Sequence, residues 1–557
     1  MSLRAALAAA AVALTLVPGQ VAARERGPGA VAGPVRLVID EDFPAAFGGH
    51  RYIGSLVLVP AFDGLVVVNE LTLERYLLGL NEVPLDWPEE ALKAQAVAAR
   101  TYALFTLARP RAGSAALYGF DICATVACQV FSGADVLLTP DGERWRRAVA
   151  ETRAEAVTYR GEPILARYHS TSGGVTFDNE QIFTTEPSYP YLVGVPSPWE
   201  QASPLYRWTV RFPVARLQRL LEEGGWWPDR FGRLVEVYSA ASSQGLHYLD
   251  VVFRGRRGAL VRTAEELRDL LRELAPALYP GRYPSRARTS SGRLPETLPS
   301  NRYEVSTRAG VAVFRGRGWG HGVGMSQYGA HGLALRGASY RAILSHYYRG
   351  TRVEKVASPG RIDVGLAWGR SSATVSGAFR IEDGRGRTLV RDALGTWRFS
   401  ARGSAVVVDP PRGHGLPLEV GLVEAPATVA PGERVRLELA LTRPARVRAL
   451  AQGAPGEVVV RRAGTSTLAW RAPERPGTYE VRVEARAGAA RRLSAPVAIV
   501  VANPASPRSR SDPAQVAAEP GLGLVAAASA TVLAAAGTML LWGRRSRSRI
   551  RSKRSSS

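Results

Sequence analysis

Alternation of apolar with small or polar positions marks a β-hairpin early in the chain. The pattern runs through residues 52–60 and 64–71, on either side of the turn Phe62-Asp63-Gly64. A period of two is typical of strands with one buried face, and the Asp-Gly pair favours a tight connection. An alanine-rich run over residues 88–107 then predicts a helix, which Arg109-Pro110 ends.

Further helices and strands follow from the same periodicities. Asp86 with Glu89 three residues later predicts a capped start for the alanine-rich helix, and Thr263 with Glu266 predicts another capped helix. More helices are expected at residues 143–155, 214–223, 265–274, 327–335 and 340–348, and more strands at 156–159, 163–169 and 311–315. The helices at 214–223 and 265–274 indicate an insertion of about residues 200–300 in a domain that spans residues 35–355.

The C-terminal half of the chain changes to short strands and turns. Residues 360–415 predict a small β region, and residues 416–503 predict an all-β sandwich. Within the sandwich, residues 476–483 are similar to a late strand of an immunoglobulin-like domain. Residues 504–520 are rich in Pro, Ser, Ala and Arg and predict a linker.

The two ends of the chain predict a targeting segment and a membrane anchor. Residues 1–23 run from Arg4 through an apolar stretch to small residues, which is the layout of a secretory signal peptide. Residues 521–542 carry no charge and are long enough to cross a bilayer as a helix. The tail at residues 543–557 contains seven cations and no acid: Arg544, Arg545, Arg547, Arg549, Arg551, Lys553 and Arg554. By the positive-inside rule we expect a single-pass protein of the cell membrane with a cytoplasmic tail and an extracytoplasmic folded part.

The predicted fold class is therefore an α+β domain with a mixed β-sheet, helices and an inserted subdomain. It is followed by an immunoglobulin-like β-sandwich and a C-terminal transmembrane helix. The formal net charge is +23, and removing the seven tail cations leaves +16, which favours an anionic partner such as a bacterial cell wall. A general bias toward arginine explains the charge equally well. An Arg/Ser tail beside a membrane helix does not favour nucleic acid as a partner.

The two cysteines of the chain, Cys123 and Cys128, lie close together in sequence. In an extracytoplasmic chain such a pair is most simply a local disulfide. A zinc site is the alternative, but a structural site normally needs four ligands and no histidine lies nearby in the sequence. We therefore favour the disulfide and expect no metal or other cofactor.

Glu82 is the candidate acid of the chain. It lies just before the alanine-rich helix in a loop that contains Pro84 and Pro88, and its neighbours Val83 and Trp87 are apolar. Partial desolvation there would raise the pKa of the carboxyl group and suit it to act as a general acid. A solvated surface glutamate is the alternative interpretation.

Two further clusters combine glycines with groups that bind ligands. The run at residues 316–324 places Trp319 and His321 among glycines, although it lacks the features of a phosphate-binding loop. The turn Ser170-Thr171-Ser172-Gly173-Gly174 ends a predicted strand with small hydroxyls. It lacks the elbow of a serine nucleophile, so hydrogen bonding to a sugar is the better interpretation, and an ordinary turn is the alternative.

Together, three stretches of the chain resemble one known family. They are residues 81–102, with Glu-Val-Pro followed by Trp-Pro-x-Glu-Ala-Leu-Lys-Ala-Gln-Ala-Val-Ala-Ala-Arg-Thr-Tyr, the turn at residues 170–174, and Gly-x-Gly-His-Gly-Val-Gly-Met-Ser-Gln-Tyr-Gly-Ala at residues 318–330. In their order and spacing over residues 35–351 they are similar to the stage II sporulation protein D / amidase-enhancer family. Members with demonstrated activity are lytic transglycosylases that cut the MurNAc–GlcNAc bond of peptidoglycan and leave a 1,6-anhydro end.

The resemblance assigns a role to individual residues. Glu82 corresponds to the catalytic acid of the family, with Val83 in place of the usual Met. Matching positions that imply contact with substrate are Lys93, Gln95, Arg100, Tyr102, Ser170, Ser172, Gly173, Gly174, His321, Gln327 and Tyr328. Pairing of Lys93 and Arg100 with helix carboxylates is the structural alternative. Some members bind zinc at the cysteine segment, but the histidine often found there is missing.

Two functions remain open at this point. The first is a lytic transglycosylase that acts on glycan strands of peptidoglycan, with Glu82 as the only acid and base. The second is a non-catalytic protein that binds the wall and enhances a partner amidase, a role described for some family members. A purely structural wall anchor built on the C-terminal sandwich gains little support from the three motifs.

Overall fold

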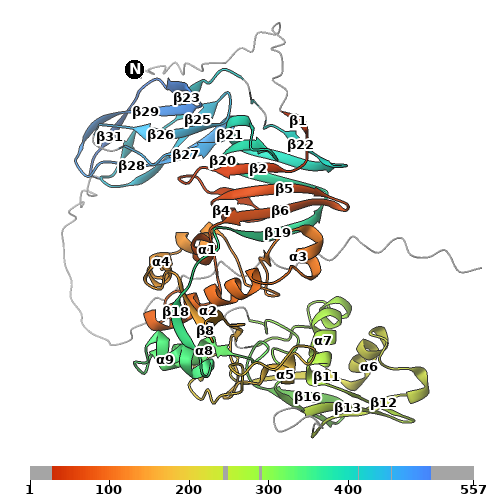
Figure 1. Ribbon diagram of the computed structural model, residues 1–557. Coiled ribbons are helices and arrows are strands. Elements are labelled where there is room, and N and C mark those ends of the chain that lie inside the picture. Colours follow the sequence, from red (N-terminus) through yellow and green to blue (C-terminus); the bar gives the residue numbers. More distant parts are fainter. Residues whose placement is uncertain are drawn as a thin grey trace, which may run out of the picture. The chain divides into compact units, whose positions relative to one another are not determined.

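The computed structural model describes residues 28–241, 249–287 and 292–503, apart from residues 412, 415, 453 and 454. These residues form two compact units (Figure 1). The first contains the described chain up to Glu200 and from Gly322 onward, and the second is Gln201–His321. The predicted signal peptide (1–23), linker (504–520), transmembrane helix (521–542) and basic tail (543–557) lie outside the described residues. Within the described ranges, no helix is long and apolar enough to span a membrane.

An 11-stranded sheet forms the centre of the first unit. Its strands in spatial order are β1 (Gly29–Ala32), β22 (Ala405–Asp409), β21 (Thr388–Arg402), β20 (Ser372–Asp383), β2 (Val35–Ile39), β5 (Ser55–Ala61), β6 (Gly64–Leu71), β19 (Ile362–Arg370) and β7 (Ile122–Cys123), with β3 (Ala45–Phe47) and β4 (His50–Tyr52) attached at β20. The predicted hairpin is β5 and β6, paired antiparallel around Phe62-Asp63. β7 pairs parallel with β19. The sheet is therefore mixed, as predicted.

The prediction of a separate small β region at residues 360–415 is wrong. Its strands β19 to β22 belong to the central sheet, where Leu37 of β2 pairs with Ile381 of β20. Partners this far apart in sequence leave no local signal, because periodicity reports only that a strand exists and not which strand it joins.

One face of the sheet carries the main hydrophobic core. Leu37 and Val67 of the sheet pack in one cluster with Leu77 of α1 (Leu73–Leu78), Ala99 of α2 (Glu89–Leu107) and Trp145 of α4 (Gly142–Glu151). Figure 1 shows these helices gathered on one side of the strands. The predicted alanine-rich helix is α2, and its small side chains are buried on nearly every side. Alanine has a small side chain, so neighbouring elements can approach α2 closely.

The start of α2 differs from its prediction. Pro88 occupies the N-cap position without a side-chain hydrogen bond, and Asp86 is exposed. Proline is compatible with the first turn because the N–H that it lacks would have no partner within the helix. The capping box of Thr263 with Glu266 is present at the start of α7 (Ala264–Leu278).

The C-terminal strands form two further sheets around one core. The strands are β23 (Val420–Glu424), β25 (Arg434–Leu441) and β28 (Gly464–Arg471) in one sheet, and β24 (Thr428–Val429), β31 (Val497–Val501), β29 (Gly477–Ala487), β26 (Ala445–Leu450), β27 (Val459–Arg461) and β30 (Ala490–Leu493) in the other. Trp470 lies in their shared core, which also contains Ala378 of β20 and Leu394 of β21. A two-sheet region is thus present, while its immunoglobulin-like character stays a prediction.

The second unit, Gln201–His321, includes most of the residues for which an insertion is predicted and continues beyond them. Its elements are β11 (Trp208–Pro213), α6 (Val214–Glu223), η2 (Asp229–Phe231), β12 (Leu234–Ala241), β13 (Leu249–Gly255), β14 (Ala259–Arg262), α7, β15 (Tyr303–Arg308) and β16 (Val311–Gly316). Phe212, Phe253 and Phe314 belong to its own core.

The remaining elements of the first unit are short. They are α3 (Gly113–Tyr118), η1 (Ala134–Leu138), β8 (Glu155–Tyr159), β9 (Glu162–Pro163), β10 (Tyr168–His169), α5 (Asn179–Ile182), β17 (Met325–Ser326), α8 (Gln327–Ala334), α9 (Tyr340–Tyr347) and β18 (Arg352–Lys355).

Replacement of Trp145 by alanine should destabilise the first unit strongly. Its side chain is 1% exposed, and its indole N–H donates to the carbonyl of Leu77 at 2.9 Å. A large-to-small change in such a core typically lowers the free energy of unfolding by about 3 to 5 kcal/mol. Denaturant unfolding followed by circular dichroism would measure the loss. The matched control is Leu138→Ala, at a 55% exposed position, with an expected change within about 0.5 kcal/mol. Equal midpoints for the two variants would contradict the packing described.

Candidate active site

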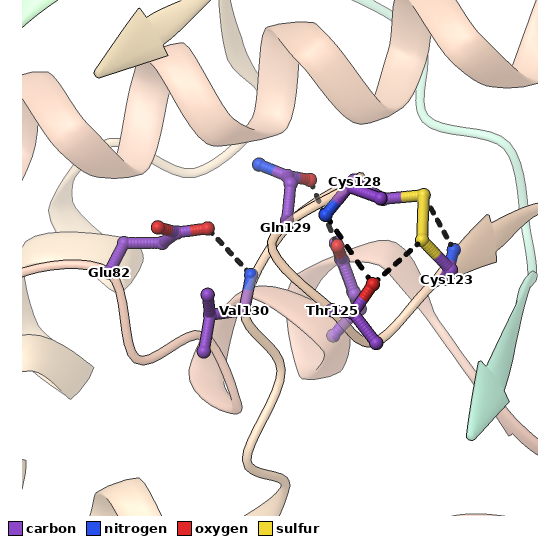
Figure 2. The surroundings of a disulfide bond; sticks show 8 residues. Glu82, Cys123, Thr125, Cys128, Gln129 and Val130 are labelled. Atoms are coloured by element: carbon purple, nitrogen blue, oxygen red, sulfur yellow. Dashed lines mark hydrogen bonds between the residues drawn. A yellow bond between two sulfur atoms is a disulfide. The ribbon is translucent and has the colours of Figure 1, made fainter. Parts of the chain in front are cut away.

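Glu82 lies in the connection between α1 and α2, where it meets a distant segment of chain. Its Oε1 atom accepts one hydrogen bond from the backbone N–H of Val130 at 2.7 Å and another from the hydroxyl of Tyr168 at 3.0 Å. The neighbouring N–H of Asn81 donates to the carbonyl of Val130, so the two segments are also joined through their backbones. Figure 2 shows the carboxyl group directed at this segment. The hydrogen bonds from Val130 and Tyr168 hold Oε1 in place, whereas Oε2 accepts no hydrogen bond from the described residues.

The environment of Glu82 changes its acidity. Burial raises the pKa of Glu82 to about 7, although the hydrogen bonds from Val130 and Tyr168 act in the opposite direction. Burial disfavours the charged carboxylate, whereas donors directed at it favour that form. The direction agrees with the sequence analysis, since Val83 and Trp87 beside it are buried. A carboxyl group that titrates near neutral pH can both donate a proton and take one up.

The segment that holds Glu82 begins at the cysteine pair. Cys123 and Cys128 form a disulfide with their Cα atoms 5.5 Å apart, as predicted. Gln129 and Val130 follow directly, and the N–H of Phe131 donates to the carbonyl of Ala124 across the loop. Across the described ranges, no group of three or more His, Cys, Asp or Glu side chains is placed to hold a metal ion.

Three polar side chains that the sequence analysis did not select complete the surroundings of Glu82. The Gln129 amide donates from Nε2 to the hydroxyl oxygen of Tyr168 at 2.7 Å. The hydroxyl of Tyr76 in α1 donates to Oε1 of the same amide at 2.9 Å. Tyr168 precedes the Ser/Gly turn by two residues and Gln129 follows Cys128 directly, so closeness to these motifs was the only available signal.

The two sides of α2 have different tasks. Gln95 and Tyr102 are seven residues apart and therefore lie on the same side of the helix, close to two full turns from each other. This side faces the site, because Gln95 accepts a hydrogen bond from Gln327 at 3.3 Å and Tyr102 lies close enough to interact with the charge of Glu82. Lys93 and Arg100 are also seven residues apart, and they occupy the opposite side of the helix.

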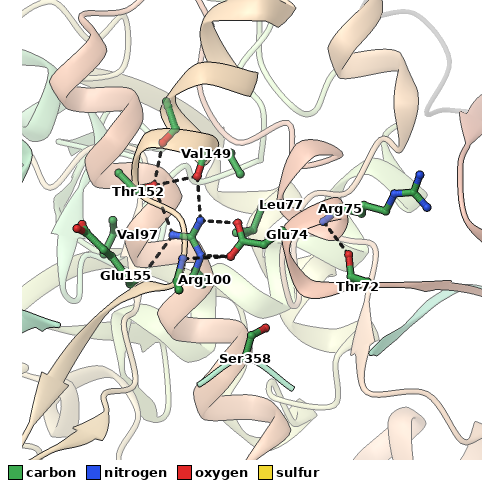
Figure 3. Close-up of polar contacts among 12 residues, drawn as sticks. Thr72, Glu74, Arg75, Leu77, Val97, Arg100, Val149, Thr152, Glu155 and Ser358 are labelled. Atoms are coloured by element: carbon green, nitrogen blue, oxygen red, sulfur yellow. Dashed lines mark hydrogen bonds and ion pairs between the residues drawn. The ribbon is translucent and has the colours of Figure 1, made fainter. Parts of the chain in front are cut away.

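The predicted contact of Arg100 with substrate is not supported. Arg100 is 1% exposed and forms a double hydrogen bond with Glu74 of α1, at 2.9 and 2.8 Å (Figure 3). Its remaining donors bind the carbonyls of Val149 and Glu155 and the hydroxyl of Thr152. A guanidinium group engaged in this way joins α1, α2, α4 and β8 and has no donor left for a glycan.

Lys93 also follows its structural alternative. Its ammonium group lies 2.7 Å from Glu151 of α4, 3.3 Å from Glu90 and 3.5 Å from Glu89. The prediction that Lys93 binds substrate is therefore corrected to an ion-pair network on the side of α2 away from the site.

The second and third motifs meet through a short parallel pairing. In β10 and β17, Tyr168 pairs with Met325 and His169 with Ser326. Parallel strands end at the same edge, so the Ser170 turn and the start of α8 emerge side by side. The backbone N–H of Tyr328 donates to the carbonyl of Ser170 at 3.0 Å. Because Tyr168 also donates to Glu82, this pairing is joined to the Glu82 loop through Tyr168.

Ser172 and Gly173 are used inside the protein. The Ser172 hydroxyl donates to Glu200 at 2.7 Å and the Gly173 N–H donates to the same carboxylate at 2.8 Å. Glu200 is fully buried and also accepts from Ser197 at 2.6 Å. Ser172 is itself buried, and Gly174 donates to its hydroxyl. The predicted roles of Ser172 and Gly173 in substrate binding are thus corrected to shaping the turn that presents Ser170.

The remaining predicted positions differ in accessibility. Tyr328 is half-buried, and its ring packs edge-on against Trp87 with ring centres 4.9 Å apart. Gln327 is buried next to Gln95. His321 is half-buried and belongs to the second unit, so its contact with substrate stays a prediction.

Comparison with known proteins identifies similar chains. The family described as Stage II sporulation protein (SpoIID) matches residues 62–159. Stage II sporulation protein D of Bacillus amyloliquefaciens is 30% identical over 305 residues, which cover 52% of this chain and 76% of that protein. Stage II sporulation protein D of Bacillus subtilis is 29% identical, with 56% of this chain and 83% of that protein covered.

Two further similarities cover less of the other protein or carry less weight. The amidase enhancer of Bacillus subtilis is 29% identical over 49% of this chain and 39% of its own length. Among solved structures, the fibronectin(III)-like modules of CbhA from Clostridium thermocellum align over 98% of their length and 15% of this chain. That alignment has 23% identity and a TM-score of 0.13, which is too low to support an argument about fold.

Replacement of Arg100 by methionine should cost stability. Removal of one partner from a buried ion pair leaves the carboxylate of Glu74 uncompensated, and the free energy of unfolding should fall by about 3 to 5 kcal/mol. Thermal and denaturant unfolding would measure it, with the exposed Arg349→Met as the control for loss of a positive charge. Unchanged stability in the Arg100 variant would instead favour the original assignment to substrate.

Proposed function

Because the chain belongs to the stage II sporulation protein D family, we propose that it remodels peptidoglycan as a lytic transglycosylase with Glu82 as acid and base. The observation that carries this proposal is the half-buried carboxyl group of Glu82, held through Oε1 and titrating at about 7. Its substrate would be the glycan strand, with the bond between MurNAc and GlcNAc as the point of cleavage.

The reaction needs only one carboxyl group. Protonated Glu82 donates its proton to the oxygen that bridges the sugars, and the bond from this oxygen to C1 of MurNAc breaks. The resulting carboxylate removes the proton from the 6-hydroxyl of the same MurNAc, whose oxygen bonds to C1 and closes the 1,6-anhydro ring. Glu82 ends protonated and no water is consumed. Glycosidases that use water or form a glycosyl-enzyme need two carboxylates at set separations.

Several side chains near Glu82 are suited to bind the sugars. Ser170, Tyr102 and Tyr328 are half-buried and so retain accessible surface. We propose that the Ser170 turn and the start of α8 form one wall of the glycan site and that Gln95 and Gln327 support it from behind. His321 and Gly174 are further proposed contacts with the glycan.

The location of the protein is part of the proposal. We propose that the predicted transmembrane helix at residues 521–542 anchors the chain in the cell membrane and that the folded part is extracytoplasmic. The disulfide Cys123–Cys128 supports this placement, since such bonds persist in oxidising compartments.

A second function, enhancement of a cell-wall amidase without catalysis, is favoured by one observation. The similarity to the amidase enhancer of Bacillus subtilis extends over 307 residues. The two functions make opposite predictions for a variant of Glu82, because an enhancer needs no proton donor.

Replacement of Glu82 by glutamine should abolish cleavage and preserve binding. The amide oxygen can accept both hydrogen bonds that Oε1 accepts, so the variant should fold normally, while its amide group cannot donate a proton as an acid does. Mass spectrometry of digests of glycan strands should detect 1,6-anhydro ends with the wild-type chain and at least about a hundredfold fewer with the variant. Sedimentation with purified wall measures binding. Equal product from both proteins, or equal stimulation of an amidase with no product from either, would contradict the catalytic role.

Activity should fall as the pH rises through about 7. The pKa of Glu82 is raised to about 7, and the protonated form that starts the reaction predominates below that pH. Above it, kcat/KM should fall about tenfold for each pH unit, because the fraction of protonated enzyme falls in that proportion. Binding of Glu82→Gln to glycan strands over the same pH range is the control for changes in the substrate. Activity that stays constant from pH 6 to pH 9 would exclude Glu82 as the acid.

A further inference from the structure

We propose that Gln129 is a positioning residue that orients the hydroxyl of Tyr168 toward Glu82 and so places the proton of the Glu82 carboxyl on Oε2. The inference rests on the proposed function insofar as Glu82 is the acid. Gln129 is 1% exposed, so it can act on the reaction only through its neighbours.

The orientation of the Gln129 amide is determined by groups of fixed polarity. Nε2 lies 3.4 Å from the carbonyl oxygen of Ala99, which can only accept a hydrogen bond. The amide nitrogen must therefore be on this side, where it also reaches the hydroxyl oxygen of Tyr168 at 2.7 Å. The amide oxygen on the other side accepts from the hydroxyl of Tyr76 at 2.9 Å.

This orientation decides the direction of the next hydrogen bond. An amide nitrogen only donates, so the Tyr168 oxygen acts as acceptor toward Gln129. The single hydroxyl proton of Tyr168 is then directed at Oε1 of Glu82, 3.0 Å away. Without Gln129, the Tyr168 hydroxyl would be free to rotate away from Glu82.

Two donors at Oε1 decide where the carboxyl proton resides. Oε1 accepts from the Val130 N–H and from the Tyr168 hydroxyl. A proton on Oε1 would compete with both donors, whereas Oε2 accepts no hydrogen bond from the described residues. The protonated carboxyl therefore carries its proton on Oε2, the oxygen left for the sugar.

The disulfide anchors the segment that contains Gln129 and Val130 to the central sheet. Cys123 lies in β7, which pairs with β19 of the central sheet, and the disulfide ties Cys128 to it. Of the next two residues, Val130 donates to Glu82 directly and Gln129 donates to the Tyr168 hydroxyl, which in turn donates to Glu82.

The other titratable groups that face Glu82 are tyrosines. Tyr76 from α1, Tyr102 from α2 and Tyr168 from β10 each interact with its charge, and burial raises the pKa of all three. Tyr102 also lies near the ion pair of Arg167 with Glu186. The three phenols therefore stay neutral while Glu82 titrates, so a titration near neutral pH reports on Glu82.

Gln129→Met tests the proposal, since methionine has a similar length and lacks hydrogen-bonding groups of comparable strength. The freed Tyr168 hydroxyl should leave Oε1, and loss of a donor to the carboxylate should raise the pKa of Glu82 by about one unit. Infrared difference spectra would follow the carboxylic acid band, assigned by its loss in Glu82→Gln. In the activity assay, kcat should fall about tenfold with KM nearly unchanged, and the alkaline limb of the pH profile should shift upward with the pKa.

Tyr168→Phe and the double variant decide whether Gln129 acts through Tyr168. Tyr168→Phe alone should produce the same upward shift, and addition of Gln129→Met to it should produce no further shift. The control is Thr101→Val, which removes a buried hydroxyl bonded to the N–H of Val157 and should leave the titration unchanged.

The outcomes separate the two proposals. An unchanged titration of Glu82 in Gln129→Met, or additive shifts in the double variant, would overturn the role of Gln129 whether or not the protein cleaves glycan. If the variants show the expected shifts in the pKa of Glu82 but the wild-type chain releases no anhydro ends, the role of Gln129 is supported and the proposed reaction is refuted.

Discussion

The site depends on the hydrogen bonds that Glu82 accepts through Oε1. They join the loop before α2 to the segment after the disulfide and to Tyr168 at the start of β10, three stretches that are distant in the sequence. Burial alone would favour a permanently neutral carboxyl group, and strong donors alone would favour a permanently charged one. The combination leaves the pKa of Glu82 near neutrality, where a single group can act first as an acid and then as a base.

Two carboxylates away from Glu82, the half-buried Glu74 and the fully buried Glu200, maintain the scaffold around it. Glu74 binds Arg100 and fixes α1 against α2, so the two helices that flank the Glu82 loop keep their relative position. Glu200 accepts hydrogen bonds from Ser172, Gly173 and Ser197, and these bonds determine the shape of the turn after β10. A charge inside a protein is stable only when partners surround it. Arg100, Ser172 and Gly173 therefore serve as partners of these carboxylates and support the site without contacting the substrate.

The helix α2 shows how one element serves both purposes. Its buried alanines allow close packing against the sheet and against α1 and α4. One side presents Gln95 and Tyr102 to the site, and the opposite side uses Lys93 and Arg100 to bind carboxylates. Residues of both sides are neighbours in the sequence motif, and only the helical period shows that they point in opposite directions.

The sequence by itself determined the local features: the hairpin of β5 and β6, the alanine-rich helix, the disulfide and Glu82 as the candidate acid. Each of these rests on residues close together in the chain, where periodicity, turn chemistry and spacing act directly. Tertiary structure alone decided that Gln129, Val130 and Tyr168 surround Glu82, that Arg100 and Ser172 face inward, and that β19 to β22 complete the central sheet. These outcomes depend on partners far away in sequence, and the choice of partner is made by packing and by the need to satisfy buried polar groups.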